Sequence, residues 1–285
     1  MKTISDFDIK QRKYMPVFPM ATGKATVYIE GYPYEDDDPM PTTGIHGRQV
    51  YTIYDQLLKY FADEQIYIGN DSFIYYSEGN ISKCVAPDIF VVLGVSNETE
   101  RRSFYTWAEG TVPIAAFEFL SDSTADQDRH EKVELYLKDI GIQEYFIHQP
   151  DMESPAEFRG WKRSPSGEIV ELEPDAEGGL FSEKLNLLFR WEEQSNDVRL
   201  LRAFLPDGTP IATSMEEKHL KEDALERLEE ETLLREIETQ RRQEAETRAA
   251  EEALLREIET QRRQEAEAEI ERLRAQLTNR QNDKR

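Results

Sequence analysis

The sequence predicts an α/β domain that is followed by a long, charged α-helix. Two observations lead to this fold class. Apolar runs of strand length alternate with segments of helical periodicity before about residue 212. The segment after residue 212 contains neither Gly nor Pro and is rich in Glu and Arg. We therefore expect three parts: an irregular segment over 1–25, the domain over 26–212 and a helical tail over 213–285.

Within the domain, apolar residues recur at helical spacing from about His46 to Ala62, which predicts the first helix. A second helix is expected from Asp128 to about Asp139, with Gly141 as its C-terminal cap. Runs rich in β-branched and aromatic residues predict the strands. These strands are expected at 26–30, 72–77, 85–93, 112–120, 143–148, 158–163, 168–172, 185–191 and 198–204.

The formal net charge of −23 restricts the classes of partner. An acidic surface repels nucleic acid at long range, because affinity for phosphate comes largely from Lys and Arg. The charge therefore disfavours a tight, sequence-independent DNA-binding protein, although it is compatible with an enzyme that has a local basic cleft. The acidic run over 35–38 is interpreted as a solvated loop.

Cysteine usage and hydropathy predict the location of the protein. The single cysteine, Cys84, excludes an internal disulfide and a cysteine-rich zinc site. The first residues lack the apolar stretch of a signal peptide, and no run approaches the ~18 apolar residues of a membrane span. A cytoplasmic protein that has no membrane partner is expected.

Three charged residues lie on adjacent predicted elements. Asp88 follows Pro87 at the head of one apolar strand, and Glu118 lies near the end of the next. Lys132 projects from the first turn of the following helix. A carboxylate amid Ala, Phe and Leu is expensive to bury unless it has a cationic partner or binds a metal. The order strand, strand, helix allows the three side chains to meet.

Two carboxylates and an ammonium group suit metal-dependent phosphodiester hydrolysis. A divalent ion polarises a phosphodiester and lowers the pKa of a bound water, and a lysine stabilises charge that develops on the phosphate. The candidate ligands are oxygen atoms, so Mg²⁺, or Mn²⁺, is expected rather than Zn²⁺.

Each of these residues also has a structural interpretation, and the sequence leaves it open. Asp88 could simply start a strand. Glu118 could be a buried ion-pair partner of Lys132, and Lys132 could lie on a plain helix surface. Asp128 is expected to cap the helix, with Glu131 completing a capping box. The combination of the three residues is more specific than any one of them.

At these residues the chain resembles the Uma2 family, a group of restriction-endonuclease-like proteins common in cyanobacteria. The family pattern is a Pro-Asp strand, a Glu-x-x-Ser strand, an Asp-x-x-x-Lys helix ending in Tyr, and a Gly-x-x-Glu-Tyr strand. All four elements are present, at Pro87-Asp88, Glu118–Ser121, Asp128–Tyr136 and Gly141–Tyr145. The resemblance covers about residues 25–215, and a charged helical tail is also common in the family.

The resemblance implies a restriction-endonuclease-like fold, in which a mixed sheet is flanked by helices. It also implies that Asp88 and Glu118 are metal ligands. In the wider superfamily a lysine follows the acidic residue at the position of Leu120, and the resemblance implies that Lys132 replaces it. Further candidates that it brings are Glu30, as a third metal ligand, and His46, Ser121 and Asp128 near the site.

The tail contains an internal repeat. Residues 233–246 recur letter for letter at 254–267, a period of three heptads. Leu234 and Ile237 form an apolar pair at a/d spacing, but the following seam positions carry Arg and Glu. Both a weak coiled coil, which would make a homo-oligomer, and a lone helix held by i,i+4 Glu–Arg pairs remain open.

The function predicted from these observations is an Mg²⁺-dependent endonuclease that hydrolyses DNA phosphodiester bonds by metal-activated water. The catalytic residues would be Asp88, Glu118 and Lys132. The alternative is a catalytically silent protein of nuclease fold that acts as a binding or assembly module through its C-terminal helix.

Overall fold

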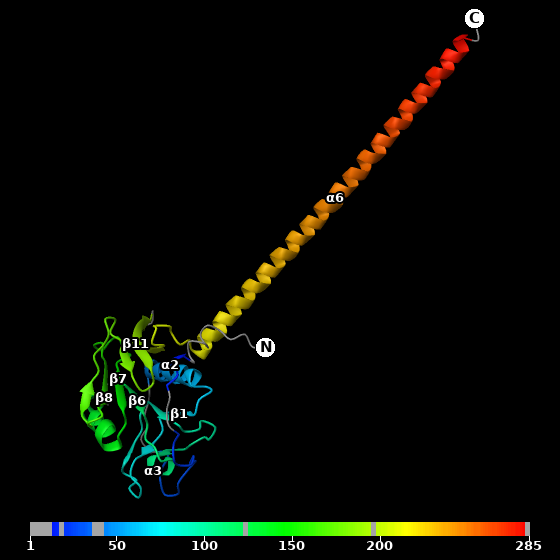
Figure 1. Cartoon of the computed structure of the whole chain (residues 1–285). Coiled ribbons are helices and arrows are strands. Elements are labelled where there is room, and N and C mark those ends of the chain that lie inside the picture. Colours follow the sequence, from blue (N-terminus) through cyan, green and yellow to red (C-terminus); the bar gives the residue numbers. More distant parts are fainter. Residues whose placement is uncertain (1–12, 17–19, 36–42, 122–124, 195–197, 283–285) are drawn as a thin grey trace. The chain divides into compact units, whose positions relative to one another are not determined.

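The computed structural model describes residues 13–16, 20–35, 43–121, 125–194 and 198–282. The chain divides into two compact units, Met1–Glu217 and Lys218–Arg285. The first unit combines sheets with helices, and the second consists of the helix α6 (Figure 1). The predicted α/β class with a long C-terminal helix is confirmed.

The central element is a mixed sheet of six strands. In spatial order these are β1 (Ile66–Asn70), β4 (Ile89–Leu93), β6 (Ala115–Phe119), β7 (Glu144–His148), β8 (Phe158–Arg163) and β9 (Ile169–Glu171). Strands β6 and β7 are parallel, and every other neighbouring pair is antiparallel. The connection between the two parallel strands passes through the helical segment that carries Lys132.

Two smaller sheets complete the strands of this unit. One is antiparallel and consists of β10 (Leu180–Ser182), β11 (Leu187–Gln194) and β12 (Val198–Phe204). The other consists of β2 (Ile74–Tyr75) between β3 (Cys84–Val85) and β5 (Phe104–Tyr105). The second small sheet carries a cluster of aromatic rings that includes Tyr32, Tyr75 and Tyr105.

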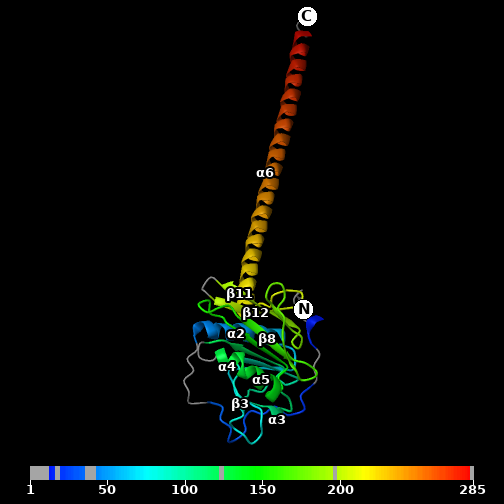
Figure 2. The same ribbon diagram turned by 90° about the vertical axis from the view of Figure 1, so that its left-hand side faces the viewer.

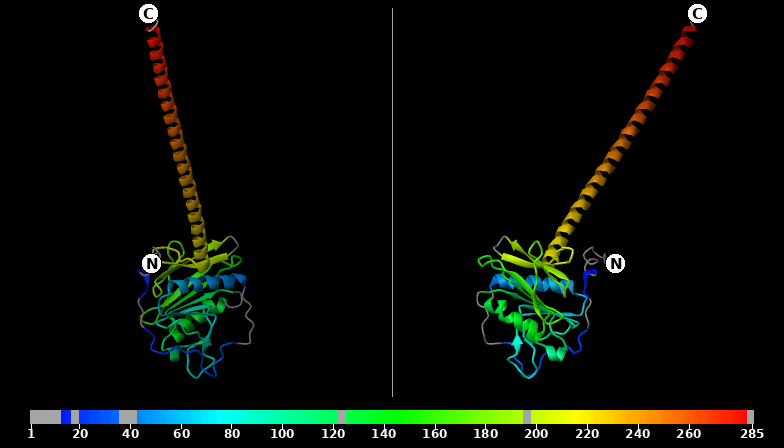
Figure 3. Two further views of the ribbon diagram at one scale, coloured as in Figure 1. Left: turned by 90° about the vertical axis from the view of Figure 1, so that its right-hand side faces the viewer. Right: turned by 60° about the vertical axis from the view of Figure 1, so that its left-hand side comes forward.

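Helical segments cover both faces of the large sheet. The helices of the described chain are α2 (Gly44–Tyr60), α3 (Thr106–Glu109), α4 (Ala125–Arg129), α5 (Glu131–Glu134), the π-helix η1 (Leu135–Ile140) and, mostly in the second unit, α6 (Ser214–Asn282). Helix α2 lies between the large sheet and the β10–β11–β12 sheet (Figures 2 and 3), where its apolar face joins the main core. The segment α4–α5–η1 covers the opposite face and makes a second core with β6, β7 and β8.

Two buried glutamines of α2 attach the helix to the outer edge of β12. The side-chain amide of Gln49 donates to the carbonyl of Leu201 at 3.1 Å and accepts the N–H of Leu201 at 2.7 Å. Gln56 accepts the N–H of Ala203 at 2.9 Å. These side chains take the place of a neighbouring strand, because buried backbone groups need partners.

We expect Gln49→Leu to lower the free energy of unfolding by about 2–6 kcal/mol, because two buried backbone groups of Leu201 lose their partners at ~1–3 kcal/mol each. Urea titration measures the change. The control is Tyr51→Leu on the same helix, whose side chain is 53% exposed. Equal stabilities of the two variants would contradict this role for Gln49.

Two predicted elements are wrong in detail. Residues 26–30 form no strand, and they lie in irregular backbone beside the small aromatic sheet. The predicted strand over 85–93 is broken at Pro87-Asp88 into β3 and β4, since Pro87 cannot donate to a sheet ladder. Three short strands, β1, β5 and β10, were not predicted from the sequence.

Helix α6 continues without a break from Ser214 to Asn282, and the repeat lies within it. Its residues are exposed from Lys218 to Arg272, a stretch over which exposure is described without a gap. Searching the described residues for a helix both long and apolar enough to cross a membrane gives none.

Candidate functional site

Asp88 lies immediately before the first residue of β4, and its side chain is 17% exposed. One carboxylate oxygen, Oδ2, accepts the backbone N–H of Phe119 at 2.6 Å. The other, Oδ1, lies 3.0 Å from Nε2 of His46. Because Phe119 directly follows Glu118 in β6, the first hydrogen bond places Asp88 beside that strand's acidic residue.

Glu118 lies in β6 with its side chain 6% exposed, on the face covered by α5 and η1. Its Oε1 accepts hydrogen bonds from Lys132 Nζ at 2.8 Å and from the Tyr136 hydroxyl at 2.7 Å. Lys132 Nζ also lies 2.6 Å from Oδ1 of Asp128. The structure therefore brings together the acidic residue of the strand and the lysine of the helix, as the sequence predicts.

The electrostatics of this cluster favour an additional positive charge. Burial raises the pKa of Glu118 to about 8, with Asp88 and Asp128 adding to the increase and Lys132 opposing it. Burial would lower the pKa of Lys132, but Glu118 and Asp128 outweigh it, so the pKa is raised and the ammonium persists. Lys132 contacts two of the three carboxyl groups, Glu118 and Asp128, and His46 contacts the third, Asp88.

His46 lies in the first turn of α2, where Thr43 caps the helix by accepting the backbone N–H of His46. The hydrogen bond to Asp88 raises the pKa of His46, burial opposes it, and the charges of Asp88 and Glu118 add to the increase. The imidazole edge also packs on the ring of Phe119. The helix start therefore places against Asp88 an imidazole whose cationic form is favoured.

The remaining predicted site residues lie in different surroundings. Asp128 is buried inside α4 and pairs with Lys132, so it does not cap the helix, and the predicted capping box is wrong because the helix begins before it, at Ala125. Ser121 follows β6, and its backbone carbonyl accepts the N–H of Ala125. Glu30 is exposed in a turn next to the aromatic sheet, and no contact to Asp88 or Glu118 is found for it in the described parts of the chain.

Tyr136 is a site residue for which the sequence analysis assigned no role. It lies four residues after Lys132, so both side chains reach the same oxygen of Glu118. The helix changes from α5 to the π-helix η1 at this point, a feature frequent at functional sites. The Tyr at the end of the Asp-x-x-x-Lys motif was the signal that could have identified it.

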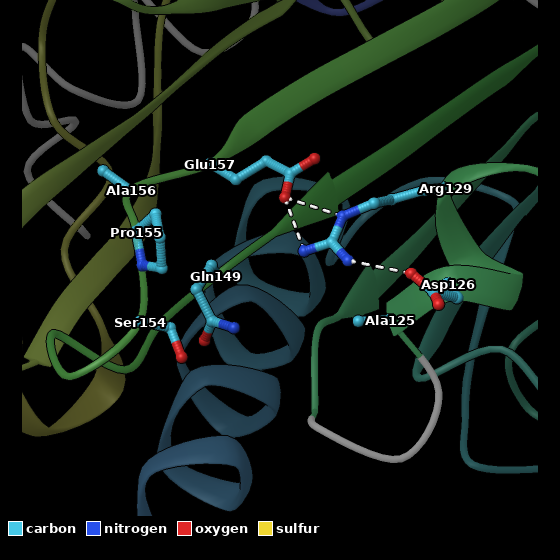
Figure 4. A pocket seen from close by; sticks show the side chains of 8 residues that line it. All are labelled: Ala125, Asp126, Arg129, Gln149, Ser154, Pro155, Ala156 and Glu157. Atoms are coloured by element: carbon cyan, nitrogen blue, oxygen red, sulfur yellow. Dashed lines mark hydrogen bonds and ion pairs between the residues drawn. The ribbon is translucent and has the colours of Figure 1, made fainter.

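A polar pocket of about 370 Å³ lies between α4 and the segment that joins β7 to β8 (Figure 4), and none of Asp88, Glu118 and Lys132 is among the residues that line it. Arg129 of α4 extends across it and pairs with Glu157 at 2.8 Å and with Asp126 at 3.5 Å. Gln149, which follows β7, and Ser154 also line it. Arg129 directly follows Asp128 in α4, and it is the cation that lines this pocket.

Glu144 of β7 is a second buried carboxyl group, which lies on the opposite face of the sheet. It accepts hydrogen bonds from the Ser182 hydroxyl and, at 3.2 Å, from the Lys184 N–H. Burial raises its pKa from 4.5 to about 7. The folded state therefore binds this proton more tightly than the unfolded chain, and the stability it contributes below pH 4.5 is lost as pH rises toward 7 and above.

We expect Glu144→Gln to remove this loss, which amounts to about 3 kcal/mol at ~1.4 kcal/mol per pKa unit. Relative to the parent, the variant should gain stability between pH 5 and pH 8.5. Urea titrations at both pH values measure the gain, and the exposed Glu173→Gln is the control. A difference between variant and parent that does not change with pH would contradict the assignment.

Comparison with known proteins identifies the family. A family model described as "Uma2: Putative restriction endonuclease" matches residues 14–181, more than half of the chain. The chain belongs to the Uma2 family. Among solved structures it is similar to one described as "a putative nuclease belonging to DUF820" from Anabaena variabilis, at 20% identity and a TM-score of 0.34. That match covers 56% of this chain and 82% of the other; no curated protein matches.

Proposed function

We propose that this Uma2 protein is an endonuclease that hydrolyses DNA phosphodiester bonds with the aid of Mg²⁺, for which Mn²⁺ can substitute. The observation that carries the proposal is the meeting of Asp88, Glu118 and Lys132 at one end of β4 and β6. Membership of a family described as restriction endonucleases supports hydrolysis of a phosphodiester.

The residues present fit Mg²⁺. Asp88 and Glu118 offer oxygen donors, which Mg²⁺ prefers, and both Lys132 and Tyr136 bond to Oε1 of Glu118 rather than to Oε2. Within the described residues no group of three or more His, Cys, Asp or Glu side chains could hold a metal ion. Two carboxylates with water and substrate oxygens completing the shell is an ordinary arrangement for Mg²⁺.

Bound there, Mg²⁺ would polarise the phosphodiester and lower the pKa of a coordinated water. Residues of the chain are positioned to assist this chemistry. Lys132 places a persistent ammonium beside Glu118, where it can stabilise negative charge that develops on the phosphate. Tyr136 and Asp128 fix the positions of Glu118 and Lys132, and His46 together with the N–H of Phe119 fixes Asp88.

The cluster is compatible with DNA as the substrate, but the protein's net charge of −23 repels DNA. Binding through a few local cations is expected to be weak and to fall steeply as salt increases. Arg129, which lines the pocket and directly follows Asp128 in α4, is our candidate for a contact to a substrate phosphate. Its pairs with Glu157 and Asp126 would then exchange for a pair with the substrate.

Plasmid nicking tests the proposal. The full chain is incubated with supercoiled plasmid at low salt with Mg²⁺, with Mn²⁺ and with EDTA, alongside Asp88→Asn, Glu118→Gln and Lys132→Ala. We expect cleavage that requires the metal and is lost in all three variants. Metal-dependent cleavage that survives all three substitutions would overturn the assignment. A well-folded parent that cleaves neither DNA nor RNA would favour the catalytically silent alternative.

A further inference from the structure

The a and d positions of one heptad frame form a stripe along α6 that is exposed to solvent and carries both apolar and charged residues. We call this stripe the seam. Leu234, Ile237, Leu255 and Ile258 are each 40–65% exposed, although they occupy a and d positions of one heptad frame. The same frame continues with Arg at a and Glu at d on either side of these pairs. These charged seam residues are Arg227, Glu230, Arg241, Glu244, Arg248, Glu251, Arg262 and Glu265.

A parallel, in-register pair of these helices would be unfavourable. In that arrangement each seam residue faces its own copy, so Arg241 meets Arg241 and Glu244 meets Glu244. The same holds for every charged layer of the seam. Like charges packed across an interface disfavour that partner or register.

In the antiparallel arrangement, opposite charges face each other in the charged layers of the seam. In a two-fold interface residue i contacts j while j contacts i, and in an antiparallel coiled coil a positions face d positions. A two-fold axis at Glu246 sets leucine against isoleucine and arginine against glutamate in every layer. The pairs are Arg227–Glu265, Glu230–Arg262, Leu234–Ile258, Ile237–Leu255, Arg241–Glu251 and Glu244–Arg248.

We propose that α6 pairs with a second copy of itself in antiparallel orientation over residues 227–265. The complementary segment ends there because the next layer sets Asp223 opposite Glu269. At 1.5 Å per residue it is about 58 Å long. The chain therefore enters the paired segment at opposite ends in the two copies. The proposal does not depend on nuclease activity.

The residues that flank the seam are compatible with this pairing. Four glutamates, Glu231, Glu238, Glu252 and Glu259, lie at e positions and approach one another on one side of the antiparallel interface. Three of them pair within their own helix, Glu231 with Arg235, Glu252 with Arg256 and Glu259 with Arg263. These exposed pairs weaken the repulsion between the glutamates, and the opposite charges in the seam layers determine the orientation.

Site-directed cross-linking of the full chain tests the orientation. In a Cys84→Ser background, which removes the chain's one cysteine, Leu234→Cys and Ile258→Cys are made separately, and one carries a mass tag. We expect mixing and mild oxidation to join the two different variants. Leu234→Cys alone should not join to itself, because its own copy lies roughly 36 Å away along the axis. Self-joined Leu234→Cys, or a monomer mass in solution for the parent at every concentration, would overturn the proposal.

Charge reversal tests the seam itself. Arg241→Glu with Arg248→Glu is expected to weaken the dimer at least tenfold, as judged by sedimentation. Adding Glu244→Arg and Glu251→Arg restores opposite charges in the antiparallel layers and should restore the dimer. The control, Arg242→Glu with Lys221→Glu, makes the same charge change off the seam, and circular dichroism monitors helix content. A dimer that is insensitive to the seam reversal, or equally weakened by the control, would refute the pairing.

Discussion

Glu118→Gln is expected to reduce metal-dependent DNA cleavage by at least about 100-fold. Loss of a group that only supports a metal ligand already costs 10–100-fold, so loss of a ligand should exceed that range. The amide oxygen can still accept the hydrogen bonds from Lys132 and Tyr136, so the domain should stay folded. Plasmid nicking rates in Mg²⁺ and far-ultraviolet circular dichroism measure the two effects.

The control for this substitution is Glu134→Gln. Glu134 lies on α5, close to Lys132 in sequence, but its side chain is 71% exposed and pairs with Lys138. Its replacement makes the same chemical change outside the cluster and should leave cleavage unchanged. A Glu118→Gln variant that cleaves at the parent rate would show that Glu118 holds no catalytic metal.

Lys132→Met is expected to lower the free energy of unfolding by about 3–5 kcal/mol, the usual cost of leaving a buried charge without its partner. Glu118 and Asp128 are 6% and 1% exposed, and Lys132 serves both. The loss should be larger at pH 8 than at pH 5. Without the ammonium the carboxyl groups bind protons more readily, and a neutral carboxyl group costs less to bury.

Urea titration at the two pH values measures this effect, with Lys138→Met as the control. Lys138 lies one and a half turns further along the same helical segment and pairs only with the exposed Glu134 in the described chain. A loss below about 1 kcal/mol for Lys132→Met at pH 8 would mean that Lys132 is the plain surface residue of the structural interpretation. That result would also remove the electrostatic basis of the site.

The sequence predicted the contact between Glu118 and Lys132 better than the local structure around it. Asp88, Glu118 and Lys132 were chosen as candidates because a carboxylate inside an apolar strand needs a partner, and the structure supplies Lys132 as the partner of Glu118. Tyr136 had no assigned role, although its spacing of four residues from Lys132 brings both side chains to the same oxygen of Glu118. Glu30 was placed by family analogy, and it lies in a turn instead.

The fold was predicted where the pattern was long and was missed where it was short. Helix α2 and strands β7, β8 and β12 follow their apolar periodicity closely. Strands β5 and β10 span two and three residues, too few for a period to be recognised. The buried Gln49 and Gln56 could not be predicted, because only the tertiary structure places β12 against α2.

The central claim is that Asp88 and Glu118 hold a divalent metal ion next to Lys132. The most direct test is a crystal structure of the protein soaked in Mn²⁺, examined by anomalous difference density. We predict a peak in contact with carboxylate oxygens of Asp88 and Glu118, and its loss in Glu118→Gln. A well-ordered cluster without a peak at saturating Mn²⁺, with Lys132 still bonded to Glu118, would contradict the claim.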